Sequence, residues 1–400
     1  MEVNKIYLGN TLDVLKTFPD ESINCCVTSP PYWALRDYGT DGVIWDGDPD
    51  CEHEFELETK ITNNAVSNNS TLHDGKGVVE TEKIKQMNNK SQIGFCNKCG
   101  AWKGQLGLEP DFNLYIKHLC DIFDEVKRVL RKDGTCWVNL GDTYNNSANG
   151  GKLASDKSGL CSGKGRNPKL DNSNFVYRNL QDLPNKSLCN IPSRFSIEMQ
   201  NRGWILRNKI IWHKPSCMPS SVTDRFTVDF EEIFFFVKNK KYWFEQQTEE
   251  MSEATIKRVF ANDNLEKRKD FGKVPQIAMS SEKAKEWNEK IRKEIENGGN
   301  PKGRNKRTVW KIPTQPFSGA HYAVFPEKLV ETPIKAGCPK DGIVLDPFMG
   351  SGTVALKALK ENRNFIGIEI NPDYIDMAYN RIRPLLSQSK LFEEELICRV

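Results

Sequence analysis

The chain has 400 residues, a formal net charge of +3 and a hydrophobic content of 38%. This length exceeds that of the usual single domain, so the sequence predicts one large domain with insertions, or two modules. No stretch reaches the apolar length of a membrane span, and the N-terminal residues lack the apolar region of a signal peptide. We therefore expect a soluble, cytoplasmic protein that does not bind a membrane.

Short apolar runs alternate with helical segments in the first part of the chain. Residues 3–9 and 23–28 are rich in β-branched side chains and predict two strands with a helix between them. From 112 to 130 the apolar residues recur on one face, which predicts a helix that Asp133-Gly134 ends. The run TCWVNL predicts the next strand. This order of elements favours an α/β fold.

The second part of the chain continues the pattern with one exception. IIW and EEIFFFV predict strands with no helix of useful length between them, so we expect an antiparallel pair. GIVLD, TVALKALKE and NFIGIEI then predict a strand, a helix and a strand, and Asn371 followed by Pro372 caps a further helix. The sequence therefore predicts an open, mostly parallel sheet with one antiparallel pair.

Three segments interrupt this alternation. Residues 46–106 and 145–190 are polar and rich in Asn, Gly and Ser, which is typical of insertions or loops. Residues 240–311 are polar, basic and helical in pattern, and from Lys257 to Lys311 sixteen Lys and Arg stand against eight Asp and Glu. Such a segment is a solvated helical face or a surface for nucleic-acid phosphates, and its charge spacing alone favours the former.

A glycine turn follows the strand predicted at GIVLD. Asp346 ends the strand, and Gly350 and Gly352 in LDPFMGSGT leave room for a ligand to approach the backbone where a helix begins. Glu369, at the end of the next strand, is placed to accept hydrogen bonds from ribose hydroxyls. The spacing differs from GxGxxG and no Walker lysine follows, which argues against dinucleotide and ATP sites. A tight turn without a ligand is the alternative.

A second motif, TSPPYW, follows the strand at 23–28 directly. Its two prolines fix the backbone and cannot donate to a sheet. Ser29 and a main-chain carbonyl can then accept both hydrogens of an amino group, and Tyr32 can stack on an extruded base. The alternative is a proline-stiffened loop with aromatic packing.

Together these motifs resemble the catalytic and cofactor motifs of amino-group DNA methyltransferases, and their order resembles the beta group of that family. HYAVFP resembles the family's additional cofactor motif, and IYLGN resembles its YxGD element, with Asn10 where aspartate is usual. The resemblance implies the fold of S-adenosylmethionine-dependent methyltransferases and direct methyl transfer without a cysteine nucleophile. It implies that the catalytic residues are Ser29, Pro30, Pro31 and Tyr32, and that the cofactor-binding residues are Asn10, His321, Phe325, Pro326, Asp346, Pro347, Phe348, Gly350, Ser351, Gly352, Thr353, Glu369 and Asn371.

The cysteines suggest a metal site. Most of the twelve lie scattered, several inside apolar runs, as reduced buried thiols would. Cys51, His53, Cys96 and Cys99 instead supply three thiols and an imidazole, a closed tetrahedral set suited to structural zinc. The run CGAWKGQLGLEP also resembles a zinc-ribbon-like insertion seen in some relatives of the family. The alternative is an ordinary reduced pair beside a surface histidine.

The motifs divide the chain into a catalytic half (1–45 and 107–239), a zinc-ribbon-like insertion (46–106), a target-recognition region (240–311) and a cofactor-binding half (312–400). A serine before Pro-Pro-Tyr is typical of N4-cytosine enzymes, so we expect methylation of cytosine N4 in duplex DNA by base flipping. The alternative is adenine N6. Less favoured are an inactive DNA-binding protein and a methyltransferase for RNA or a protein amide. A cognate restriction endonuclease is an expected partner.

Overall fold

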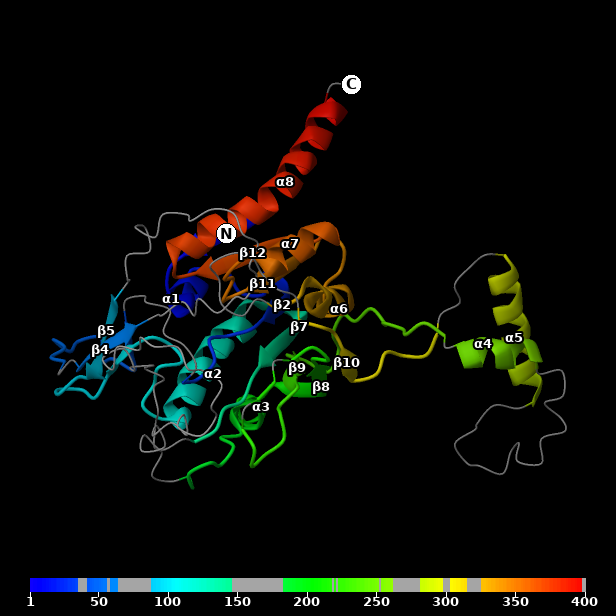
Figure 1. Cartoon of the computed structure of the whole chain (residues 1–400). Coiled ribbons are helices and arrows are strands. Elements are labelled where there is room, and N and C mark those ends of the chain that lie inside the picture. The colour runs from blue at the N-terminus through cyan, green and yellow to red at the C-terminus, as the bar shows by residue number, and fades with distance from the viewer. Residues whose placement is uncertain are drawn as a thin grey trace, which may run out of the picture. The chain divides into compact units, whose positions relative to one another are not determined.

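The computed structural model describes residues 1–34, 42–55, 58–63, 88–145, 183–217, 219–220, 222–251, 253–261, 281–297, 303–314 and 325–397. The chain divides into two compact units, of which the larger comprises Met1–Trp243 and Trp310–Val400 and the smaller comprises Phe244–Val309. The elements labelled in Figure 1 are, in chain order, β1 (Lys5–Leu8), α1 (Thr11–Lys16), β2 (Ile23–Thr28), β3 (Val43–Trp45), β4 (Glu58–Asn63), β5 (Asn88–Phe95), β6 (Trp102–Gly104), α2 (Phe112–Val129), β7 (Leu130–Leu140), α3 (Ile191–Asn201), β8 (Ile205–His213), β9 (Phe230–Val237), α4 (Glu253–Ala261), α5 (Ser281–Glu296), β10 (Val309–Lys311), α6 (Glu327–Gly337), β11 (Ile343–Asp346), α7 (Thr353–Lys360), β12 (Asn364–Glu369) and α8 (Pro372–Ile397).

Eight strands form the main sheet, in the order β1-β12-β11-β2-β7-β9-β8-β10. The strands from β1 to β7 in this order run parallel to their neighbours, whereas β9 runs antiparallel to both β7 and β8. The predicted fold class, an open and mostly parallel sheet in which IIW pairs antiparallel with EEIFFFV, is therefore confirmed.

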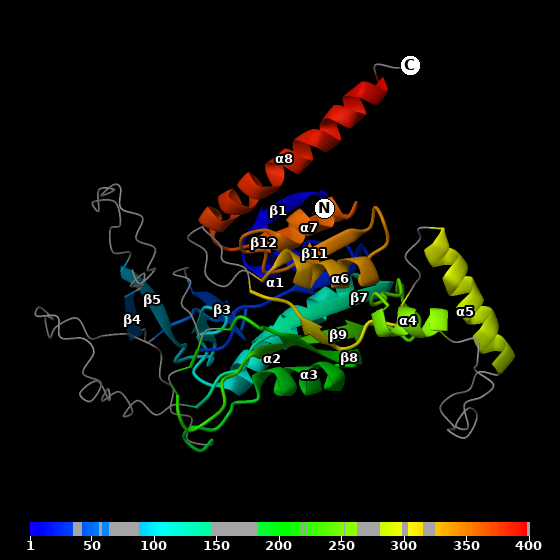
Figure 2. The ribbon, with the colours of Figure 1, turned by 45° about the vertical axis from the view of Figure 1, so that its right-hand side comes forward.

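Helices cover both faces of the main sheet (Figure 1 and Figure 2). α1, α2 and α3 lie on one face, and α6, α7 and α8 lie on the other. Alternate side chains of β9 pack into the two hydrophobic cores on either face of the sheet, because successive residues of a strand point to opposite faces. Phe234 and Phe236 belong to the core with α2 and α3, and Phe235 belongs to the core with α6 and α7. Burial on both faces explains why EEIFFFV lacks polar alternation.

α2 begins and ends for identifiable reasons. The Asp111 side chain accepts hydrogen bonds from the second and third backbone N–H groups of the helix, as an N-cap residue does. The helix predicted at 112–130 is confirmed as Phe112–Val129, but the prediction that Asp133-Gly134 ends it is wrong. Leu130 is already extended and pairs with Ile23 of β2, and Asp133-Gly134 lies inside β7, where the register with β2 shifts. Sheet pairing here overrides the local helix-ending signal.

A second sheet, in the order β3-β6-β5-β4, lies within the larger unit. Its pairs are antiparallel, and Trp45 of β3 pairs with Trp102 of β6. Both indoles stack on the imidazole of the fully buried His118 in α2, with ring centroids 4.6 and 5.5 Å apart. The segment predicted as an insertion or loop at 46–106 thus contains strands of its own, and Trp102 within it packs on α2.

The smaller unit contains α4 and α5, which pack against each other. Val259 and Ile291 are buried, and Arg292 Nε donates to the Val259 carbonyl at 2.8 Å. The helical pattern predicted within 240–311 is confirmed by α5, which covers most of KAKEWNEKIRKEIENG. Among the described helices of both units, none has the length and apolar character needed to cross a membrane.

Candidate functional site

The two motifs singled out in the sequence meet at one edge of the main sheet. β2 and β11 are neighbouring parallel strands, so their carboxyl ends lie together. Thr28 Oγ1 donates to Asp346 Oδ1 at 2.6 Å, although the two residues are 318 positions apart in the chain. The carboxyl edge of a parallel sheet is the place where open α/β folds bind their ligands.

Glu369 holds the glycine turn that follows β11. The backbone N–H groups of Gly350 and Asn371 donate to its two carboxylate oxygens, each at 2.8 Å. Gly352 has a φ of +78°, and a Cβ at this position would lie 2.7 Å from Cβ of Ala378. Only glycine combines this backbone conformation with this close approach. The turn is therefore a fixed structure.

Burial raises the pKa of both carboxyl groups at this edge of the sheet. Asp346 is 1% exposed, and burial raises its pKa to about 7, against hydrogen bonds from Thr28 and from the Phe348 N–H that lower it. Burial likewise raises the pKa of Glu369, against the backbone N–H groups that donate to it. A cationic ligand at this edge would favour the ionised form of both acids.

Two other predicted cofactor residues of the turn face α8. The hydroxyls of Ser351 and Thr353 are buried and accept from the guanidinium of Arg381 at 3.0 and 3.1 Å. Arg381 also donates to the Ser351 carbonyl at 2.6 Å. These side chains therefore attach the turn to α8, and a ligand contact from Ser351 or Thr353 would come from the backbone.

The remaining predicted cofactor residues that the structure describes lie at the same edge or close to it. The Asn10 side-chain oxygen caps α1 by accepting from the N–H groups of its second and third residues, and Thr11 Oγ1 donates to the Pro347 carbonyl at 2.7 Å. Pro326 immediately precedes α6. His321 lies outside the described residues.

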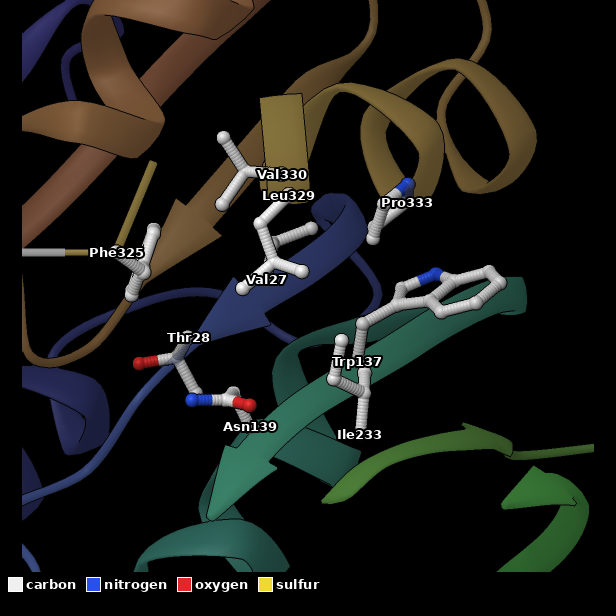
Figure 3. Close-up of a pocket in the computed structure, with 9 residues that line it drawn as sticks. All are labelled: Val27, Thr28, Trp137, Asn139, Ile233, Phe325, Leu329, Val330 and Pro333. Carbon is white, nitrogen blue, oxygen red and sulfur yellow. The ribbon is translucent and has the colours of Figure 1, made fainter. Parts of the chain in front are cut away.

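A small, partly open cavity lies beside the two motifs (Figure 3). It joins Thr28 at the end of β2 with Phe325, one of the cofactor-binding residues that the family resemblance implies. Its lining residues are Val27, Thr28, Trp137, Asn139, Ile233, Phe325, Leu329, Val330 and Pro333. The cavity is therefore mostly apolar, with Thr28 and Asn139 as its polar residues.

The Pro-Pro turn is held from two sides. The Tyr115 hydroxyl on α2 donates to the Pro31 carbonyl at 2.8 Å. The ring of Tyr32 lies against Gly141, where a Cβ would come within 2.6 Å of its Cε2 atom. Ser29 Oγ lies 3.3 Å from the Tyr32 hydroxyl. The two side chains predicted to act on the base are thus adjacent on a rigid turn.

Three polar residues that the sequence did not single out surround Tyr32. The Tyr32 hydroxyl donates to Glu231 Oε2 at 2.7 Å, and Asn139 Nδ2 lies 2.7 Å from both oxygens. Lys214 forms an ion pair with the other oxygen of Glu231. Burial and the Glu231 carboxylate raise the pKa of Tyr32 well above its usual value. Two features of the sequence could have pointed to these residues, namely a polar Asn139 inside the apolar run WVNL and the acids at the start of EEIFFFV.

The predicted metal ligands converge in the larger unit. Ligand atoms of Cys51, His53, Cys96 and Cys99 all lie within 4.8 Å of one another. Cys51 and Cys96 have a sulfur–sulfur distance of 4.0 Å, and Cys99 Sγ lies 3.3 Å from His53 Nδ1. Zinc–ligand bond lengths in a tetrahedron give about 3.8 Å between two sulfurs and about 3.5 Å between sulfur and nitrogen. The four side chains therefore fit a tetrahedral zinc ion.

Comparisons with known proteins match the segment that contains both motifs to one family. Residues 23–380, which span both motifs, match the model of a family described as DNA methylase. The type II methyltransferase M.Cfr9I of Citrobacter freundii is 32% identical over 378 residues, which cover 94% of this chain and 87% of the relative. The type II methyltransferase M.SmaI of Serratia marcescens is 30% identical over 380 residues, 94% of this chain and 90% of the relative. Among solved structures, the PvuII DNA methyltransferase (cytosine-N4-specific) is 17% identical with a TM-score of 0.48, over 95% of this chain and 86% of that chain.

Proposed function

Because the chain belongs to the DNA methylase family, we propose that this S-adenosylmethionine-dependent DNA methyltransferase acts on the N4 amino group of cytosine in duplex DNA. The observation that carries the choice of base is Ser29, which stands directly before Pro30-Pro31-Tyr32 and beside the Tyr32 hydroxyl. A serine at this position is typical of N4-cytosine enzymes in the family that the sequence resembles.

The cofactor edge suits a large cation with an apolar part. When bound, S-adenosylmethionine supplies an electrophilic methyl group on a sulfonium cation. The buried carboxyl groups of Asp346 and Glu369 favour a cation at this edge, and we assign the ribose hydroxyls to Glu369. Phe325 and Phe348 supply apolar surface, and the Asn10 amide N–H group can donate to a ring nitrogen of the adenine.

Ser29 and Tyr32 act on the base. An aromatic amine is a poor nucleophile because its lone pair is conjugated with the ring. Hydrogen bonds accepted by Ser29 Oγ and the Pro30 carbonyl favour a pyramidal nitrogen and stabilise the charge that develops there. The Tyr32 ring lies against Gly141, and we assign a face of this ring to the extruded cytosine.

We assign target recognition in duplex DNA to the region 240–311, which contains the smaller unit. Sixteen Lys and Arg between 257 and 311 provide the positive charge that DNA phosphates attract. The similar M.Cfr9I and M.SmaI are named type II methyltransferases, and we extend to this chain the cognate restriction endonuclease that the sequence led us to expect.

The test is identification of the modified base. Purified protein is incubated with duplex DNA and methyl-deuterated S-adenosylmethionine, and the DNA is digested to nucleosides for mass spectrometry. We expect labelled N4-methyldeoxycytidine. Labelled N6-methyldeoxyadenosine would show that the enzyme acts on adenine N6 instead. The absence of label in DNA, together with label in RNA or protein, would contradict the DNA substrate.

We further propose that Cys51, His53, Cys96 and Cys99 bind one structural zinc ion. The observation that carries this is the convergence of three thiols and one imidazole at tetrahedral distances. The Glu54 N–H donates to Cys96 Sγ at 3.4 Å, as backbone groups do around metal-bound sulfur. All four tetrahedral positions are taken by side chains, so the ion would hold the small sheet and would take no part in methyl transfer.

A further inference from the structure

We propose that Glu231 is a positioning residue for methyl transfer, acting through the Tyr32 hydroxyl to present Ser29 Oγ as a hydrogen-bond acceptor to the target amino group. The inference rests on the assignment of Ser29 to the amino group, and it applies to cytosine and adenine alike. It concerns the group formed by Ser29, Tyr32, Asn139, Lys214 and Glu231, referred to below as the Tyr32 cluster.

The sheet register places the members of the cluster on one face. Asn139 of β7 is opposite Ile233 of β9, and Glu231 lies two residues from Ile233 and therefore points to the same side. Glu232 points to the opposite face and pairs with Lys209 at 2.7 Å. Lys214, just beyond β8, reaches Glu231 at the edge of the sheet. Glu231 and Lys214 are mostly buried, with side chains 17% and 20% exposed.

The direction of each hydrogen bond follows from the chemistry of its groups. An ionised carboxylate only accepts hydrogen bonds, so the Tyr32 hydroxyl must donate to Glu231. Asn139 Nδ2 is also a donor, and it serves both Glu231 and Tyr32. The Tyr32 oxygen has then used its proton and can only accept from Ser29. The Ser29 hydroxyl proton is thereby directed to Tyr32, which leaves the lone pairs of Ser29 for a substrate N–H.

Two further observations support this arrangement. The raised pKa of Tyr32, caused first by burial and then by the Glu231 carboxylate, keeps the phenol protonated and able to donate. Asn139 lines the cavity beside Thr28, and its Oδ1 atom is one of three buried side-chain atoms in the described residues that lack a hydrogen-bond partner. Buried acceptors of this kind are satisfied by a ligand or by water.

The cluster also gives the departing proton a route. As the amino nitrogen bonds to the methyl carbon, the carbon–sulfur bond breaks and its electron pair goes to sulfur. One amino proton must then leave. It passes to Ser29 Oγ, the Ser29 proton passes to the Tyr32 oxygen, and the Tyr32 proton passes to Glu231 Oε2, which ends as a neutral acid. Without the carboxylate, the Ser29 hydroxyl is free to point its proton at the amino group and oppose the reaction.

The test is a double-mutant cycle on the full chain, measured as the single-turnover rate of methyl incorporation into DNA at saturating S-adenosylmethionine. Glu231→Gln keeps the shape of the side chain, and Tyr32→Phe keeps the ring but removes the link to Ser29. We expect each change to slow the rate about a hundredfold, the lower range for positioned proton transfer. Dissociation constants for S-adenosylmethionine and DNA should change by no more than about twofold. In the Tyr32→Phe background, Glu231→Gln should cost less than about threefold, because its effect passes through the missing hydroxyl.

Glu232→Gln is the matched control, since it removes the neighbouring carboxylate on the other face of β9 and should leave the rate unchanged. Independent, multiplicative losses in the cycle would overturn the proposal, and so would a wild-type rate for Tyr32→Phe, which needs no folded Glu231 variant. The rate counts methyl groups on any base. Detection of N6-methyladenine would therefore change the proposed target without affecting this result.

Discussion

We predict that Asp346 makes the binding of S-adenosylmethionine depend on pH. Its carboxyl group is buried beside Thr28, and burial raises its pKa to about 7. S-adenosylmethionine carries sulfonium and ammonium cations, and a nearby cation favours the ionised form of a carboxyl group. Protonation of Asp346 and binding of the ligand therefore oppose each other. The affinity should fall as the pH decreases through about 7 and should be constant well above it.

The pKa fixes the size of the effect. If S-adenosylmethionine binds only when Asp346 is ionised, a pKa of about 7 sets the apparent dissociation constant relative to its value at high pH. The constant is then about elevenfold higher at pH 6 and about 1.1-fold higher at pH 8. The expected ratio between the two pH values is about tenfold, or about 1.4 kcal/mol of binding free energy. Asp346→Asn removes the titrating group, so it should bind more weakly at pH 8 but with the same affinity at both pH values.

Calorimetric titrations at pH 6, 7 and 8 provide the measurement. Thr28→Val gives a second test of the sign, because the Thr28 hydroxyl lowers the pKa of Asp346. Its loss should raise that pKa further and move the drop in affinity to a higher pH. Equal dissociation constants at pH 6 and 8 for the unaltered chain would refute the reasoning. An equally steep pH dependence in Asp346→Asn would show that another group is responsible.

Three other changes test the turns and the metal site. Gly352→Ala should lower the free energy of unfolding by more than the roughly 1–2 kcal/mol that a left-handed alanine costs, because its Cβ also meets Ala378. Gly203→Ala is the control, since Gly203 is also left-handed but its Cβ would meet only the end of a flexible lysine. Urea unfolding of both variants compares the two losses. Cys99→Ser should lose the one zinc per chain expected by elemental analysis of the unaltered protein, and a stable wild type without metal would contradict the site. Tyr32→Ala removes the ring together with the hydroxyl, so lost base stacking should lower methyl transfer by about tenfold to a hundredfold beyond the loss expected for Tyr32→Phe and leave the affinity for S-adenosylmethionine nearly intact; full activity would mean that the Pro-Pro-Tyr turn is only structural.

The spacing of apolar residues and the turn-forming residues in the sequence were enough to predict many of the helices and strands. The β11–α7–β12 unit and the antiparallel β8–β9 pair follow from local patterns of apolar residues and glycines. The order of the strands does not follow from them, because neighbours in a sheet are chosen by contacts between distant segments. Nothing in GIVLD alone indicates that β11 lies between β12 and β2. That neighbourhood nevertheless brings Thr28 to Asp346.

The candidate site shows the same limit at the level of single side chains. Ser29 and Tyr32 could be proposed because the prolines between them fix a short local structure. Glu231 could not be separated from Glu232, since the two are adjacent in EEIFFFV and only the pairing register decides which one faces Tyr32. Ser351 illustrates the opposite case, in which a motif residue directs its side chain toward Arg381 for structural reasons.

The end of β2 lies between the proposed cofactor site and the proposed site for the base. Thr28 donates to Asp346 at the cofactor edge, and the next residue, Ser29, lies against Tyr32 on the side proposed for the base. A single peptide unit thus separates Thr28, the partner of Asp346, from Ser29, which we propose accepts the amino hydrogen. In-line transfer depends steeply on distance, because misplacing the reacting atoms by about 1 Å can cost about a hundredfold in rate. The prolines that follow and the Tyr115 hydrogen bond to Pro31 restrict the movement of this peptide unit, and we expect them to preserve the alignment.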